Sequence, residues 1–338
     1  MRLTGLVVRA FIAALSFGAA MPPAIAAEGT QLRIATVAPA GSSFHKRLQA
    51  LGNEWSKGPG GVSMNIYAGT QGGEPQIVRR MRVGQIQGAM LTSVGLGQID
   101  RSVTALQYLP LLFRDWDDVD AVREKLRPEL EARLLKAGYI VLFWGDGGWV
   151  RYFSKKPITK IGDLKSMRVY TSSGDPATVD IFKNFYTPVV LEPDQILLGL
   201  RNGMIDALPV PPLLANFSQV ATYAPYMLDL HWAPVTGALV ITARAWNQLD
   251  PKAQAWLRES SEKAGAEFRS ASRVEDDQTI QAMKDKQGLK VTTLSPEAER
   301  EWRAEVARYY PRVRGTIIPE QMFDAAVETL KGRHASGQ

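Results

Sequence analysis

The same order of predicted secondary-structure elements occurs twice in this chain, and this repetition constrains the fold more than any other feature. Periodic apolar residues predict a first βαβαβ unit, with its elements at residues 31–37, 41–57, 62–67, 74–83 and 86–91. A second βαβαβ unit is predicted at residues 167–171, 175–186, 189–191, 194–202 and 204–208. Two units with one element order predict two similar α/β lobes.

The two units also share a local sequence where the second helix ends. Met81–Ile86 can be laid on Leu200–Ile205, which puts Gly84 and Gly203 at the same place. Glycine lacks a Cβ, so it ends a helix in the left-handed conformation at little cost. The match predicts the same turn in both lobes.

A long helix is predicted between Asp250 and Gly288. Asp250 is an N-cap candidate, Pro251 suits a first helical turn, and no Gly-Pro interruption follows. At about 1.5 Å per residue this helix would be about 55 Å long, which is enough to cross both lobes. The alternative is two helices with an unrecognised turn between them. The apolar residues predict one buried face as far as Val274 and a different face from Ile280 onward.

The N-terminal residues 1–26 have the layout of a cleaved secretion signal. Two arginines precede an apolar stretch at 11–20, and Ala24-Ile25-Ala26 forms a small-residue cleavage site. An uncleaved membrane tether is the alternative. No later segment has the roughly 18 consecutive apolar residues of a membrane helix, and the chain has no cysteine to carry a lipid or a disulfide. The sequence predicts a periplasmic protein that is not itself membrane-embedded.

Several classes of function find no support in the residues. The formal net charge is +6, but the basic residues are mixed with acids and form no basic stripe for nucleic acid. His45, His231 and His334 lack the spacing of metal ligands. Neither a nucleophile elbow nor a phosphate-binding glycine loop is present. The sequence nominates no catalytic residue, metal or cofactor, although a hydrolase with paired carboxylates stays an open alternative.

Polar residues gather where predicted strands end and helices begin, which is where open α/β sheets bind ligands. In the first lobe the candidate ligand-binding residues are Ser43, Phe44, His45 and Ser93. In the second lobe they are Tyr170, Ser172, Ser173 and Asp175. Trp149 and Trp232 are predicted near the hinge or the second rim, where aromatic rings can wall an organic ligand. Two such rims facing each other predict a ligand cleft between the lobes.

Six stretches carry a resemblance to a known family over nearly the whole mature chain. They are Tyr67–Glu74, Met81–Ala89, Leu109–Phe113, Arg151–Ile158, Gly162–Lys165 and Ile205–Ala207. Their order and spacing resemble the solute-binding proteins of TRAP (tripartite ATP-independent periplasmic) transporters, of the DctP type. The resemblance implies a two-lobed periplasmic-binding-protein fold (type II-like), a small organic anion such as a carboxylate as ligand, and a membrane permease as partner.

The resemblance also implies which residues hold a carboxylate. Arg151 matches one of the two arginines that the family uses, whereas the other arginine position falls on Tyr170. A commonly used asparagine falls on Val210. Arg168 shares a strand face with Tyr170, and a structural ion pair is the favoured role for it over ligand contact. Arg151 is therefore the predicted carboxylate anchor, because its planar guanidinium suits a carboxylate.

The predicted division of the chain follows from the two units and the long helix. Lobe I takes residues 27–148 and about 235–270, and lobe II takes residues 149–234 and about 271–330. The predicted function is that of a receptor and not of an enzyme. Two alternatives remain: a solute-binding protein of another transporter or sensor, and a secreted α/β enzyme.

Overall fold

Two three-stranded units of the same topology form the halves of this protein, whose computed structural model describes residues 29–172, 179 and 182–335. The predicted secretion signal, Ser173 and Asp175 lie outside these residues. The first unit contains β1 (Gln31–Thr36), α1 (Ser43–Lys57), β2 (Ser63–Ala68), α2 (Glu74–Arg82) and β3 (Gly88–Thr92). Its strands are parallel in the order β2-β1-β3. All five predicted elements are present.

The second unit repeats this order. It contains β5 (Arg168–Ser172), β6 (Thr187–Leu191), α7 (Ile196–Arg201) and β7 (Ala207–Val210). Its parallel strands lie in the order β6-β5-β7, which matches β2-β1-β3. Half of the residues of the predicted helix at 175–186 lie outside the described residues. The third strand begins at Ala207 and not at Met204 as predicted, because the preceding residues are used by the turn.

The turn that precedes the third strand is the same in both units. The amides of Gln85 and Ile86 donate to the carbonyl of Arg80 (2.9 and 3.4 Å). In the second unit the amides of Met204 and Ile205 donate to the carbonyl of Gly199 in the same way (2.8 and 3.2 Å). The glycines at the matched positions 84 and 203 have φ of 76° and 72°, as the aligned sequences predict.

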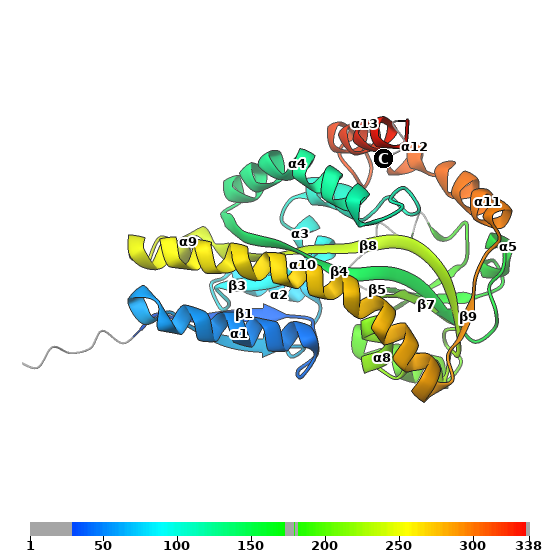
Figure 1. Cartoon of the computed structure of the whole chain (residues 1–338), viewed down its shortest axis with the longest axis horizontal. Coiled ribbons are helices and arrows are strands. Elements are labelled where there is room, and N and C mark those ends of the chain that lie inside the picture. The colour runs from blue at the N-terminus through cyan, green and yellow to red at the C-terminus, as the bar shows by residue number, and fades with distance from the viewer. Residues whose placement is uncertain (1–28, 173–178, 180–181, 336–338) are drawn as a thin grey trace, which may run out of the picture.

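Two long antiparallel strands join the units into one sheet. β4 (Tyr139–Ser154) pairs with β8 (Tyr226–Thr242) over most of their length, β8 also pairs with β3, and β4 also pairs with β7. The full order is β2-β1-β3-β8-β4-β7-β5-β6, with β9 (Lys290–Thr292) beside β8. The protein is therefore an α/β structure with two lobes, and strands β4 and β8 run through both (Figure 1).

The predicted long helix is one helix, α10 (Pro251–Gln287). The side chain of Asp250 caps its first turn, and Gly288 ends it with a φ of 69°. It packs against α1 of the first lobe and α8 (Pro212–Phe217) of the second, and Figure 1 shows it crossing both. A bridging helix was correctly predicted.

The predicted change of buried face within α10 is wrong. Val274 is 57% exposed, whereas Asp276 is buried. One continuous stripe is buried along the helix, and it runs through small and polar residues: Ala253, Leu257, Ser261, Gly265, Phe268, Ser272, Asp276, Thr279, Ile280 and Met283. The apolar positions alone were misleading, because close packing on β4 and an ion pair bury residues that are not apolar.

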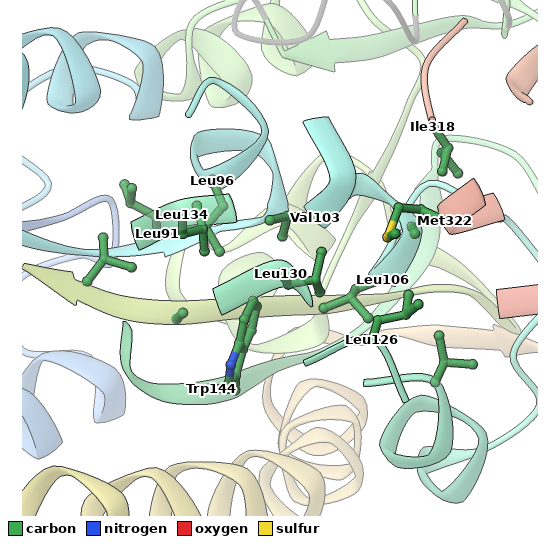
Figure 2. Close-up of a cluster of buried hydrophobic side chains, with 14 of the residues drawn as sticks. Leu91, Leu96, Val103, Leu106, Leu126, Leu130, Leu134, Trp144, Ile318 and Met322 are labelled. Atoms are coloured by element: carbon green, nitrogen blue, oxygen red, sulfur yellow. The ribbon is translucent and has the colours of Figure 1, made fainter. Parts of the chain in front are cut away.

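Helices cover both faces of the sheet. On the face opposite α10 lie α4 (Trp116–Lys136) and α13 (Glu320–Ala335). Figure 2 shows the cluster beneath them, which contains Leu126 and Leu130 of α4 and Trp144 of β4. The remaining helical segments are η1 (Pro59–Gly61), α3 (Ser93–Gly97), η2 (Arg101–Leu106), α5 (Ile161–Leu164), η3 (Pro193–Gln195), η4 (Val220–Thr222), α9 (Ala243–Trp246), α11 (Pro296–Ala307) and α12 (Tyr310–Val313). Within the described ranges, none of the helices has the length and apolarity to span a bilayer.

Gly265 sets the distance between α10 and β4, and this leads to a first testable prediction. A Cβ at position 265 would lie 2.6 Å from the Cβ of Phe143. We expect Gly265→Ala to lower the free energy of unfolding by about 1–2 kcal/mol, because overpacking outweighs the gain in helix propensity of about 1 kcal/mol. Denaturant unfolding measures this change. Gly332→Ala in α13 is the control, since no atom lies within 4 Å of its added Cβ; a gain for both variants would contradict the prediction.

Candidate binding site

Two cavities open where strands of the two lobes end. The interlobe cavity has a volume of about 340 Å³. It is lined by the end of β1 and the start of α1 from the first lobe, by α8 from the second, and by the middle of β4 and β8, for example at Ser43, Thr92, Leu214 and Thr236. Its wall therefore comes from both lobes and from the strands that join them.

The aromatic cavity is smaller, with a volume of about 170 Å³. The end of β5 contributes Tyr170 and Ser172, and β8 contributes Trp232. The segment after η2 brings Tyr108 from the first lobe, and the segment between α11 and α12 brings Tyr309. Aromatic side chains thus converge from segments that are far apart in the sequence.

Some of the predicted binding residues line one of the two cavities, and others line neither. Those that line the interlobe cavity are Ser43 and Phe44, and those that line the aromatic cavity are Tyr170, Ser172 and Trp232. Those that line neither cavity are His45, Ser93, Trp149, Arg151 and Val210. The ligand-binding roles of these residues stay a prediction.

Arg151 lies in a buried ion-pair network. Its side chain is 3% exposed and contacts three groups. Nη1 donates to Oδ2 of Asp276 (3.1 Å), Nε donates to Oδ1 of Asp229 (3.2 Å), and Nη2 lies 3.1 Å from Nε2 of His231. The neighbouring residue Val150 lines the aromatic cavity, whereas Arg151 is directed toward α10. The guanidinium is thus already engaged by two carboxylates.

The surroundings shift the pKa values of two groups in this network. Burial raises the pKa of Asp276, although hydrogen bonds from the Trp149 amide and from Arg151 oppose the shift. Burial and the charge of Arg151 lower the pKa of His231, so the imidazole is neutral at pH 7. The tautomer with the proton on Nδ1 fits both contacts of His231, because Nε2 then accepts from Arg151 and Nδ1 faces the carbonyl of Arg114 at 3.4 Å.

Other predicted binding residues also have partners inside the protein. The ring of Trp149 stacks on His231, with centroids 4.5 Å apart and planes 6° apart. The hydroxyl of Ser93 lies 2.8 Å from that of Thr236, and the hydroxyl of Ser43 donates to Glu275 of α10 (3.0 Å). His45 accepts from the amide of Gly41 through Nδ1 (3.0 Å).

The position of the missing family arginine lies at the aromatic cavity. Tyr170 is 8% exposed there, and burial raises the pKa of its hydroxyl to about 12, so it is neutral at pH 7. Arg168 does not take over the role, because it is paired with Asp206 (2.9 Å) and lines neither cavity. Among the described residues that line the two cavities, none is lysine, arginine or histidine.

A second buried ion-pair network borders the interlobe cavity, and sequence reasoning missed it. Asp146 of β4 is fully buried and accepts from Arg123 of α4 (2.7 Å) and Arg273 of α10 (2.8 Å). Both arginines also contact Asp120. Glu74, another buried acid, accepts from the amides of Thr92 (2.6 Å) and Gly95 (2.7 Å). These residues could not be predicted from the sequence, because their partners lie far away along the chain and no local motif indicates the pairing.

In the described part of the chain, no group of three or more His, Cys, Asp or Glu is placed to hold a metal ion.

Comparison with known proteins gives one family match and several relatives. The model of a family described as DctP, bacterial extracellular solute-binding protein, family 7, matches residues 34–315. A solute-binding protein of Sulfitobacter sp. (strain NAS-14.1) is 26% identical over 190 residues, which cover 55% of this chain and 57% of that relative. An uncharacterized protein of Salmonella typhimurium (strain LT2) is 24% identical over 236 residues, which cover 67% of this chain and 70% of that protein.

Solved structures share the fold at lower sequence identity. A TRAP periplasmic solute-binding protein of Ralstonia eutropha H16 with bound (S)-2-acetolactate has a TM-score of 0.83 at 19% identity, over 90% of this chain and 99% of that one. A Bordetella pertussis extracytoplasmic solute receptor that binds pyroglutamic acid has a TM-score of 0.81 at 18% identity, over 90% of this chain and 100% of that one. A Shewanella oneidensis protein with bound succinate has a TM-score of 0.82 at 14% identity, over 89% of this chain and 99% of that one.

Proposed function

This chain belongs to the DctP family of bacterial extracellular solute-binding proteins, family 7, and from that premise we propose that it is the periplasmic receptor of a TRAP transporter. It captures a small organic acid in the cleft between its lobes and delivers the acid to a membrane permease. In this proposal lobe I comprises residues 27–148 and about 235–270, and lobe II comprises residues 149–234 and about 271–330.

The interlobe cavity is the observation that carries this function. Its wall combines residues of both lobes at the carboxyl ends of β1, β3 and β7. A solute bound there contacts both lobes at once, so it favours a closed arrangement over an open one. Organic acids are the solutes named for the Bordetella, Ralstonia and Shewanella structures, and this supports an acid as the ligand class.

The anchor for a carboxylate stays a prediction. Arg151 is the residue that the family resemblance assigns, and its guanidinium is held by Asp276 and Asp229. An acid that reached Arg151 would have to replace one of these carboxylates. Asp229 is the more exposed of the two, at 42%, and so it is the one that a solute displaces at lower cost.

Retention of an unchanged solute tests the receptor function. We expect one organic acid to bind with one-to-one stoichiometry and to raise the melting temperature, because a ligand at a thousandfold excess over its Kd stabilises the folded form by about 4 kcal/mol. Native mass spectrometry, calorimetry and thermal unfolding with a panel of organic acids measure this. The control is the recovery of the solute unchanged after long incubation. Consumption of the best hits would support the enzyme alternative instead.

A further inference from the structure

We infer that the aromatic cavity receives an uncharged, apolar six-membered ring of the solute, so that this receptor selects acids with an apolar ring over open-chain dicarboxylates and hydroxyl-rich sugar acids. The inference rests on the proposed function, namely that the cleft binds a small organic acid, and it names the class of acid. Four features of the cavity carry it: its walls, its charge, an unpaired hydroxyl and its size.

The walls present aromatic rings that are already packed against one another. The rings of Phe182 and Tyr186 stack, with centroids 5.8 Å apart and planes 17° apart, and the ring centroids of Phe182 and Trp232 are also 5.8 Å apart. The ring centroids of Phe185 and Tyr309 are 4.2 Å apart. Such ring edges and faces favour a further ring in offset or edge-to-face contact. A flexible, hydroxyl-rich sugar acid gains little from such walls.

The charge around the cavity disfavours a buried carboxylate. Its described lining contains neither a cation nor an acid. Burying a charge without a partner is costly. The part of the solute inside the cavity is therefore uncharged, and a carboxylate stays at the mouth.

A hydroxyl inside the cavity is unpaired. Thr171 lines the cavity and is 6% exposed, and its Oγ1 has no hydrogen-bond partner among the described residues. A buried hydroxyl without a partner loses the hydrogen bonds that water provides. A polar atom on the solute supplies the missing partner, so Thr171 is a ligand contact that the sequence did not nominate.

The size and the rigidity of the cavity fit one ring. A volume of about 170 Å³ is close to that of the roughly 150 Å³ cavity known to bind benzene. The segment that contains Pro110 and Leu111 forms part of the cavity wall and is held by two hydrogen bonds. The Leu111 amide donates to the carbonyl of Trp232 (2.7 Å), and the Tyr310 hydroxyl donates to the carbonyl of Pro110 (2.7 Å). Leu111 has a φ of 59°, which non-glycine residues seldom adopt, so these contacts hold a strained backbone. The cavity is preformed.

A calorimetric panel on the full mature chain tests the ring. The probes are benzoate and cyclohexanecarboxylate, the uncharged benzamide, and two acids without an apolar ring, the open-chain succinate and galacturonate, whose pyranose ring carries hydroxyls. We expect benzoate and cyclohexanecarboxylate to bind at least about thirtyfold more tightly than succinate and galacturonate, and benzamide to bind within about tenfold of benzoate. Tight binding of succinate or galacturonate alone would overturn the ring inference and leave the proposed receptor function standing. Loss of binding with benzamide would also overturn it, because a carboxylate anchor would then determine affinity. Turnover of every hit, or no binding by any organic acid, would overturn both.

Two variants place the ring in this cavity. Thr171→Val keeps the shape and removes the hydroxyl, and we expect benzamide affinity to fall about threefold to tenfold while the melting temperature of the ligand-free protein is unchanged or higher. Ala233→Leu adds volume to the cavity wall and should abolish binding of the ring compounds. Ser261→Ala is the control: its hydroxyl in α10 is also buried and unpaired, but it lies outside the cavity. Unchanged affinity in both Thr171→Val and Ala233→Leu, with the fold intact, would show that the ring binds elsewhere.

Discussion

Replacing Arg151 by alanine should lower the free energy of unfolding by about 3–5 kcal/mol, because it leaves the buried carboxylate of Asp276 without its cation. Denaturant unfolding at pH 7 measures the loss. The double variant Arg151→Met with Asp276→Leu is the control, since removing both charges together should restore much of the stability. A loss below about 1 kcal/mol for Arg151→Ala would show that the pair is not structural.

The pH dependence of the same variant gives an independent readout. The pKa of Asp276 is already raised above its ordinary value of 3.8 by burial, and Arg151 opposes the shift. Without Arg151 the pKa should rise further. A carboxyl with a higher pKa in the folded protein than in the unfolded chain binds its proton first in the folded state, so stability increases as the pH falls through the folded pKa. The deficit of Arg151→Ala should therefore shrink on acidification from pH 7 toward pH 5.

Replacing Asp146 by asparagine should cost about 3 kcal/mol, because it removes the charge that Arg123 and Arg273 share inside the protein. Arg123 is 2% exposed and cannot turn to water. Thermal and denaturant unfolding measure the loss. The matched control is Asp120→Asn, which touches the same two arginines but is 39% exposed; we expect it to cost about 1 kcal/mol or less. Equal losses would contradict a special role for the buried acid.

Local patterns were sufficient to predict the two units and the long helix. The alternation in residues 62–67, the glycines at the helix ends and the Asp250 cap act within a few residues, and each appears in the structure at or within a few residues of its predicted place. Which face of α10 is buried could not be predicted in this way. Asp276 is buried because Arg151, 125 residues away, neutralises it, and Gly265 is buried because Phe143 approaches it closely.

In the candidate site, too, local sequence predicted some of the lining residues but not their distant partners. The rule that ligands bind at strand ends predicted Tyr170 and Ser172, and Trp232 was predicted near the hinge or the second rim; all three line one cavity. The partners that surround them come from elsewhere: Tyr309 and Tyr310 reach the cavity from the far end of the chain. Nothing in the sequence around these tyrosines indicates a ligand, since their role depends on where the last third of the chain packs. The engagement of Arg151 by acids was hidden for the same reason.

Strands β4 and β8 run through both lobes, and this has a consequence for folding of the nascent chain. β3 ends at Thr92, but the strand that covers its open edge, β8, begins only at Tyr226. A nascent chain that stops short of that point carries an uncovered strand edge, which is a template for aggregation. Pairing over such sequence distances also slows folding. We therefore expect a chain truncated before β8 to accumulate as insoluble material and not as a folded first half.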